Sequence, residues 1–186
     1  TDTKISGTVV FTGTVTDEKR VNSIYLTTSK SFSKEAVSSK EIAKYDTTSG
    51  GFTLTQPADG LTFAITSNKF STENGHKVGW SLTVDTSKVE GVAASNVKFT
   101  VAASDERKTS AADYQADIVP YITGIERSLT TKSTKTMNRS TYGEYPVAVG
   151  DTLKVSGWNF GTSPTVKVGS TPMTVTDVNA NGTSFT

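Results

Sequence analysis

The sequence predicts an all-β protein that consists of two consecutive β-sandwiches. Apolar residues make up 34% of the 186 residues and fall in short runs that alternate with polar residues, which is the pattern of half-buried strands. Threonine, whose β-branched side chain suits the wet face of a sheet, is the commonest residue. Turn residues separate the runs at short intervals, and strands at such spacing are typical of a sandwich.

The clearest strand signal in the first part of the chain lies at residues 5–15. Its odd-numbered positions, from Ile5 to Val15, are apolar residues or glycine, whereas its even-numbered positions are mostly threonine, with Val10 as the exception. Asn74-Gly75 is the strongest hairpin signal, because both residues tolerate the positive φ of a type I′ turn. Further strands are predicted at residues 21–26, 52–54, 61–65, 80–84 and 97–103.

Only one stretch, residues 33–45, has a helical composition. Good helix formers such as Glu35 and Ala36 follow Ser33, which is a suitable N-cap residue. Ser38-Ser39 interrupts the stretch. We therefore expect at most a turn or two of helix, within a loop.

The composition changes near residues 116–119, where we place a domain boundary. Residues 105–117 are polar and weakly patterned, and an apolar pattern restarts at Ile118. The predicted domains are 1–117 and 118–186, and a long polar loop is expected between Ile125 and Val147. Strands of the second domain are predicted around Ile122/Ile125, Val147/Val149, Leu153/Val155, Val166/Val168, Met173/Val175 and at the start of 184–186.

The second part resembles the IPT/TIG family of immunoglobulin-like domains. The resemblance is carried by residues 120–125 (Pro-Tyr-Ile-Thr-Gly-Ile), by 150–161 (Gly-Asp-Thr-Leu-Lys-Val-Ser-Gly-Trp-Asn-Phe-Gly) and by 166–169 (Val-Lys-Val-Gly). Within residues 150–161, Gly157 and Gly161 allow a tight reversal of the chain, and Phe160 is expected to bury its ring beneath this reversal. The last strands of the family are missing here, so the second sandwich is expected to be incomplete at its C-terminus.

The first part resembles a bacterial immunoglobulin-like repeat. The resemblance rests on residues 6–9 (Ser-Gly-Thr-Val), on 79–85 (Gly-Trp-Ser-Leu-Thr-Val-Asp) and on 97–103 running into Ser104-Asp105-Glu106. Together the two resemblances imply two tandem immunoglobulin-like β-sandwiches. Trp80 is in phase with its apolar neighbours and is expected in the core.

No sequence pattern of an enzyme is present. His76, the only histidine, follows the predicted hairpin turn and is expected to be solvated, and no nucleophile elbow, zinc motif or phosphate loop occurs. The chain has no cysteine, so it has neither a disulfide framework nor a thiolate metal site. A net charge of +1 argues against nucleic acid as the partner, and no apolar run is long enough for a membrane span.

Two acidic pairs, Asp17-Glu18 and Asp105-Glu106, are the weak candidates for metal binding. If their loops lie at the same end of the sandwich, they could supply oxygen ligands to Ca²⁺. The alternative is a solvated loop with local ion pairs, because Lys19-Arg20 and Arg107-Lys108 follow immediately. We predict no cofactor other than this weak calcium candidate.

The polar segment after Ile125 carries four positive charges against Glu126 and is the predicted partner-contact region. The alternative interpretation of this segment is a solvated insertion. Trp158, in a turn, is a further candidate for contact, including stacking on a sugar. The partner-contact candidates are Arg127, Lys132, Lys135, Arg139, Tyr142, Tyr145 and Trp158.

These observations favour a non-catalytic structural or adhesive module of a larger bacterial surface protein, at the extracellular or cell-envelope surface. The expected partners are a protein or glycan at the cell surface and neighbouring domains of the same polypeptide. The alternative is an accessory module, carbohydrate-binding or spacing, of a secreted carbohydrate-active enzyme. Coplanar exposed aromatic rings would favour that alternative.

Overall fold

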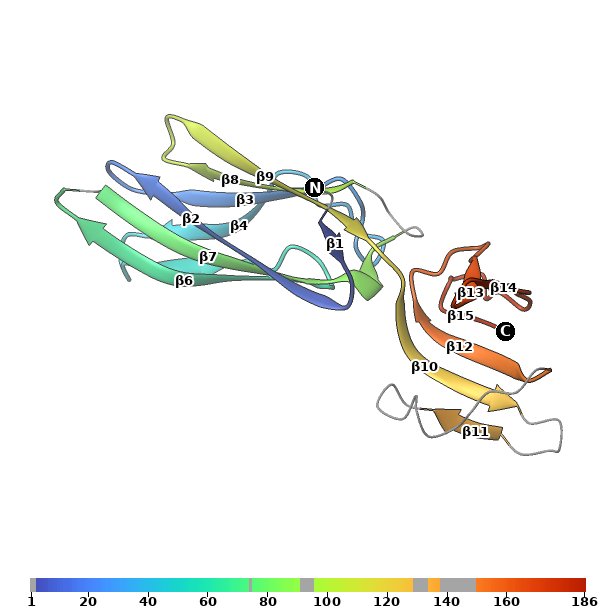
Figure 1. The fold of residues 1–186 in the computed structure, drawn as a ribbon. Helices are drawn as coiled ribbons and strands as arrows, with labels where there is room; N and C mark the ends of the chain where they lie inside the picture. The colour runs from blue at the N-terminus through green and yellow to red at the C-terminus, as the bar shows by residue number, and fades with distance from the viewer. Residues whose placement is uncertain (1–2, 74, 91–95, 129–133, 138–149) are drawn as a thin grey trace. The chain divides into compact units, whose positions relative to one another are not determined.

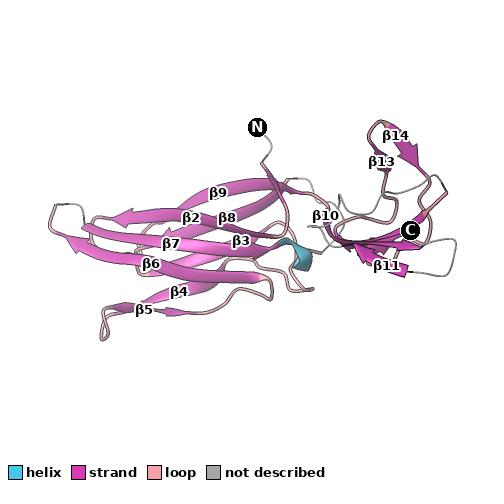
Figure 2. Cartoon of the chain, turned by 60° about the horizontal axis from the view of Figure 1, so that its bottom comes forward, coloured by secondary structure: helices cyan, strands magenta, loops and turns pink. Residues whose placement is uncertain are grey.

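The computed structural model describes residues 3–73, 75–90, 96–128, 134–137 and 150–186 (Figure 1). The regular secondary structure in these ranges consists of β-strands and one 3₁₀ turn, Thr86–Lys88, which confirms the all-β class (Figure 2). Contacts between Cα atoms divide the chain into two compact units. The first unit ends at Ile118 and the second begins at Val119.

The first unit contains two sheets. One is a six-stranded sheet in the order β1 (Lys4–Ile5), β9 (Thr109–Ile118), β8 (Val97–Ser104), β3 (Ser23–Thr28), β4 (Lys40–Asp46) and β5 (Gly51–Leu54). The other is three-stranded, in the order β2 (Thr8–Asp17), β7 (Gly75–Asp85) and β6 (Leu61–Ser71). All neighbouring strands are antiparallel except β1 and β9, which run parallel.

Aromatic contacts join the two sheets of the first unit across its core. The rings of Phe11 on β2 and Phe99 on β8 have centroids 5.4 Å apart, and Trp80 on β7 meets Tyr114 on β9 edge-on at 5.5 Å. Trp80 is only 2% exposed, which confirms its predicted place in the core. Directly opposite on β2 stands Gly13, where a Cβ atom would overlap the indole ring of Trp80. Burying rings of this size supplies much of the hydrophobic stabilisation of a small domain.

The predicted first strand is divided between the two sheets. Its alternation is confirmed, because the even-numbered residues of β2 are exposed, Val10 among them at 56%. The strand does not run unbroken from Ile5, however. Gly7 adopts a positive φ of 67°, a conformation that glycine tolerates well, and there the chain leaves the six-stranded sheet and joins the three-stranded one.

The helical prediction for residues 33–45 is wrong. Ser33 and Lys34 have positive φ values of 45° and 71°, which a right-handed helix cannot contain, and residues from Lys40 onward form strand β4. The register between β3 and β4 shifts at Ile24/Tyr25, so Ile42 and Ala43 are both buried although they are consecutive. This irregularity removed the alternation by which a strand is recognised.

The polar segment 105–117, for which the sequence predicts no strand, is mostly strand β9. The residues from Thr109 to Asp113 are all exposed, and only towards the end of the strand are Ala116 and Ile118 buried.

The predicted hairpin is confirmed by its strand pairing, because β6 and β7 run antiparallel up to Ser71 opposite Gly75. Asn74 lies outside the described residues.

The second unit has a four-stranded sheet and a separate two-stranded one. The four-stranded sheet has the order β11 (Thr134–Met137), β10 (Tyr121–Ser128), β12 (Thr152–Trp158) and β15 (Ser184–Phe185), and β13 (Val166–Val168) pairs with β14 (Thr171–Met173). Its core holds Val155, Phe160 and Phe185, with the last two rings 5.0 Å apart. The burial predicted for Phe160 is thereby confirmed.

Part of the loop predicted after Ile125 is strand. β10 continues to Ser128, and β11 pairs with it from Ile125 opposite Met137 to Ser128 opposite Thr134. The strand predicted around Val147/Val149 lies outside the described residues.

Candidate recognition site

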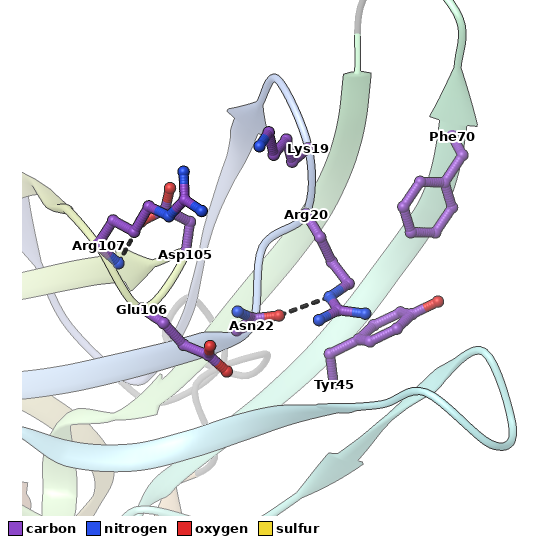
Figure 3. A pocket seen from close by; sticks show the side chains of 8 residues that line it. All are labelled: Lys19, Arg20, Asn22, Tyr45, Phe70, Asp105, Glu106 and Arg107. Atoms are coloured by element: carbon purple, nitrogen blue, oxygen red, sulfur yellow. Dashed lines mark hydrogen bonds between the residues drawn. The ribbon is translucent and has the colours of Figure 1, made fainter.

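One end of the first unit is hollowed between two loops and two strands (Figure 3). The hollow has a volume of about 520 Å³. The β2–β3 loop and the β8–β9 loop flank it, and strands β4 and β6 contribute one aromatic side chain each. The lining residues are Lys19, Arg20, Asn22, Tyr45, Phe70, Asp105, Glu106 and Arg107.

The two loops are built in the same way. In the β2–β3 loop, a carboxylate oxygen of Asp17 accepts the backbone N–H groups of Lys19 (2.8 Å) and Arg20 (2.6 Å). In the β8–β9 loop, Asp105 accepts those of residues 107 and 108 at 2.8 and 2.6 Å. The sequences Asp-Glu-Lys-Arg at 17–20 and Asp-Glu-Arg-Lys at 105–108 therefore form matching turns in which the aspartate caps the basic residues that follow.

These hydrogen bonds stabilise the charged form of the Asp105 carboxylate. The backbone N–H of Lys108, and next that of Arg107, hold the pKa of Asp105 below its usual value of 3.8. The carboxylate is therefore ionised at neutral pH and the turn is held in shape. Both loops present their basic side chains from a fixed backbone.

Arg20 connects the first loop to the aromatic side of the hollow. Its Nε donates a hydrogen bond to the Asn22 side-chain oxygen at 2.6 Å. Its guanidinium carbon lies 5.4 Å from the centroid of the Tyr45 ring, a cation–π contact that holds the side chain over β4. Figure 3 shows Arg20 between the loop and Tyr45.

The aromatic side of the hollow rests on a buried histidine. Phe70, which is 55% exposed, stacks on His76 with centroids 3.9 Å apart and planes at 11°. Tyr45 meets the His76 ring edge-on at 5.5 Å, and Phe52 stacks on it at 6.1 Å. An aromatic side chain as exposed as Phe70 is a typical contact residue, because it offers apolar area at a small entropic cost.

The prediction that His76 is solvated is wrong, because its side chain is fully buried. Its Nδ1 accepts the backbone N–H of Val21 at 3.0 Å, and its Nε2 lies 2.6 Å from the Asn68 side-chain oxygen. A neutral ring protonated on Nε2 satisfies both contacts. Burial lowers the pKa of His76 below 6.5, Asp17 opposes that shift and Arg20 adds to it. His76 is thus a structural support beneath the hollow.

The calcium candidates are spread across this end of the unit. Asp105 and Glu106 line the hollow, whereas Asp17 and Glu18 do not, and one side-chain oxygen (Oδ1) of each aspartate accepts backbone N–H groups of its own loop. Within the described part of the chain, no group of three or more His, Cys, Asp or Glu side chains is placed to hold a metal ion.

The partner-contact candidates fall in the second unit. Arg127 forms an ion pair with Asp151 at 2.6 Å, and both side chains are largely buried, at 17% and 7% exposure. Lys135 lies in β11 with its backbone opposite Arg127. Trp158 is not in a turn as predicted but is the last residue of strand β12; it is half-buried, and its ring lies parallel to that of Tyr121, at 8° and 5.7 Å. Lys132, Arg139, Tyr142 and Tyr145 lie outside the described residues.

The sequence marks the two charged loops only as weak calcium candidates, and it gives no prediction for the aromatic half of the hollow. Tyr45 lies in β4, within the stretch for which the sequence predicts a turn or two of helix. Phe70 follows the register shift between Ile65 and Ser67 on β6, where the alternation begun at Leu61 changes phase. An apolar residue out of phase, close to a hairpin turn, is the signal that could have identified it.

Comparison with protein-family models, with curated proteins and with solved structures finds no match for this chain. The fold and the site described above therefore carry the functional argument alone. Among the residues that the structure describes, no helix has the length and apolar character needed to cross a membrane.

Proposed function

We propose that the chain is a pair of immunoglobulin-like modules, and the strand order of the first unit supports this. The order β9-β8-β3-β4-β5 corresponds to strands G-F-C-C′-C″ of a variable-type immunoglobulin domain, and β2-β7-β6 corresponds to B-E-D. The first unit departs from antibody domains in its tryptophan, which lies on β7 rather than on the strand that corresponds to C. In the second unit, buried Phe160 beside Gly161 (φ 87°) supports the resemblance to the IPT/TIG family.

Its function is to present a non-catalytic binding surface in a structural or adhesive protein of the bacterial cell surface. The observation that carries this proposal is the hollow, whose lining combines the aromatic rings of Phe70 and Tyr45 with the guanidinium groups of Arg20 and Arg107. Aromatic residues and arginine are the side chains enriched at protein interfaces and among their energetic hot spots. In variable-type immunoglobulin domains, loops at one end of the sandwich are also where ligands bind.

A protein partner suits this hollow better than a flat sugar ring does. The Tyr45 ring is inclined by 72° to the ring of Phe70, the other aromatic residue that lines the hollow, so the two rings do not share the plane that a flat sugar ring would stack on. The lining also contains two carboxylates, two guanidinium groups and the ammonium group of Lys19. Such mixed charge fits a polypeptide surface, which carries both signs and apolar side chains.

The test is binding of the full chain to a panel of purified extracellular and cell-surface proteins, followed by variants. Phe70→Ala and Arg107→Ala are each expected to weaken binding about tenfold or more. Met173→Ala, which truncates another exposed apolar side chain (47% exposed) in the second unit, is the matched control and should bind normally. Binding that survives both hollow variants, or no binding to any protein, would refute the proposal.

One observation favours the alternative, an accessory module of a carbohydrate-active enzyme. The rings of Tyr121 and Trp158, on neighbouring strands β10 and β12, stack on each other nearly in parallel, and both residues are partly exposed. A glycan array probed with the full chain and with Trp158→Ala separates the two functions. Glycan binding that Trp158→Ala abolishes and Phe70→Ala preserves would establish the alternative in place of the first proposal.

A further inference from the structure

Strand β2 lies at the edge of its sheet, and its hydrogen bonds to β7 determine which of its residues direct their backbone groups away from that sheet. The Thr86 N–H donates to the Gly7 carbonyl at 3.0 Å, and the register with β7 is unbroken from Thr8 to Asp17. In an antiparallel ladder, every second residue bonds to the neighbouring strand. The odd-numbered residues of β2 therefore bond to β7, and the even-numbered ones direct their N–H and C=O groups away from it. The outward residues are Thr8, Val10, Thr12, Thr14 and Thr16.

No described strand pairs with these outward groups. The side chains of the same residues are exposed, so the edge is accessible from the wet face of the sheet. Unpaired edges invite pairing with another chain, and proteins normally protect them with charges, prolines, bulges or short strands. From Thr8 to Thr16 the strand has no charge, no proline and no register shift.

The other sheet edges of the first unit carry such protection. On β6 the register shifts between Ile65 and Ser67, and Lys69 follows. β5 has four residues and β1 two. β9 carries Asp113 near its middle, paired with Lys98, and its end is covered by β1. Only β2, among the described edges of this unit, combines length with lack of protection.

We propose that a second copy of this chain pairs with the β2 edge, antiparallel and about a two-fold axis at Thr12. This register places Thr12 opposite Thr12, Val10 opposite Thr14, and Thr8 opposite Thr16, so each outward residue meets an outward residue. Identical surfaces on both copies are what a two-fold interface requires. At the ends of the strands Asp17 comes opposite Gly7, so like charges do not meet. The three-stranded sheets of the two copies then form one continuous sheet.

We infer a second copy of the chain as the partner of the β2 edge because this edge is complementary to itself. Cross-strand threonine pairs are favourable neighbours on a sheet, and the pairing Thr12–Thr12 and Thr8–Thr16 supplies them on the exposed face. An acidic or basic extended segment finds no countercharge between Thr8 and Thr16. The inference concerns a surface separate from the hollow, and it stands whatever the hollow binds.

Sedimentation velocity of the full chain tests the proposal. The wild type is expected to form a species of twice the 19.7 kDa chain mass that dissociates on dilution. Thr12→Lys places two ammonium groups against each other at the two-fold axis and should give only monomer. Thr62→Lys, the same change at an exposed position of β6 in the same sheet, should still dimerise. Circular dichroism of both variants checks that they fold.

A covalent test checks the register. Paired residues in this geometry have Cα atoms about 5.5 Å apart, which a disulfide can span. Because the chain has no cysteine, Thr12→Cys should form a single intermolecular disulfide on oxidation, and Thr62→Cys should form none. A wild type that stays monomeric at every concentration, a Thr12→Lys dimer, or equal crosslinking of both cysteine variants would overturn the proposal.

Discussion

His76 makes the stability of the first unit depend on pH in a range where no other side chain of this protein ordinarily titrates. It is the only histidine, it is fully buried, and burial lowers its pKa in the folded state. In the unfolded chain it takes up a proton near its ordinary pKa of about 6.5. The folded state resists that proton, so the unfolded state binds more protons and gains stability as the pH falls below about 6.5.

The size of this change in the free energy of unfolding follows from the linkage between proton binding and unfolding. One proton bound only by the unfolded state lowers the free energy of unfolding by at most about 1.4 kcal/mol for each pH unit. Stability is therefore fully present above about pH 7 and decreases from pH 6.5 down to the folded-state pKa of His76. Below that value the loss levels off. A proton on Nδ1 also costs the acceptor of the Val21 N–H, a buried hydrogen bond.

Urea unfolding at pH 7.5, 6.5 and 5.5 measures this effect. In a Trp158→Phe background, fluorescence reports on Trp80 and so on the first unit alone. The matched variant His76→Gln removes the titrating ring and keeps an amide oxygen that can accept a hydrogen bond. It is expected to lose stability overall and to show no change between pH 7.5 and 5.5. If wild type and His76→Gln lose the same stability over this range, the reasoning is refuted.

Four aspartate carboxylates affect the stability in a separate, more acidic pH range. Asp46, Asp59, Asp105 and Asp113 have pKa values lowered below 3.8, chiefly by backbone N–H donors at Asp46 and Asp105 and by side-chain donors at the other two. A lowered carboxylate pKa stabilises the folded state above about pH 4, and this stability is lost as the pH falls through the folded-state value. A second decrease below pH 4, present in His76→Gln as well, is therefore expected.

Three further predictions concern steric and ionic contacts, each measured as a urea midpoint by tryptophan fluorescence. Gly13→Ala drives a methyl group into the Trp80 ring and is expected to cost about 1–3 kcal/mol; an unchanged midpoint would contradict this packing. Gly157→Ala meets the Tyr121 carbonyl and should destabilise the second unit alone, by a similar amount. Asp151→Asn leaves a largely buried guanidinium without its charge partner, so about 3–5 kcal/mol is expected, and a loss below 1 kcal/mol would contradict a buried pair.

The fold was predictable where a strand alternates strictly between a wet and a buried face. β2 does so along its length and β7 does so from Trp80 to Asp85, and the sequence predicts a strand in both places together with the buried position of Trp80. β4 was missed because an irregular register buries Ile42 and Ala43 in succession. β9 was missed because much of it is an exposed edge, where burial imposes no apolar pattern.

The candidate site was predictable only in its turns. The acidic pairs at Asp17 and Asp105 mark loops by local chemistry, since an aspartate that caps its own turn needs no distant partner. The aromatic side of the hollow depends on tertiary placement. Phe70 has a local signal in its out-of-phase position, but its contact with Tyr45 over His76 has none, because it depends on where β6 and β4 end in space.

The parallel pairing of β1 with β9 has a mechanical consequence. The first strand of the unit lies beside its last, with Lys4 opposite Asp117 and Ile5 opposite Ile118, and the Asp117 N–H donates to the Thr3 carbonyl at 2.8 Å. A tension applied to the chain on either side of this unit pulls two parallel strands in opposite directions along their length. The bonds between them are then loaded together in shear rather than opened one after another. Resistance to such a force is governed by the rate of unfolding and not by equilibrium stability.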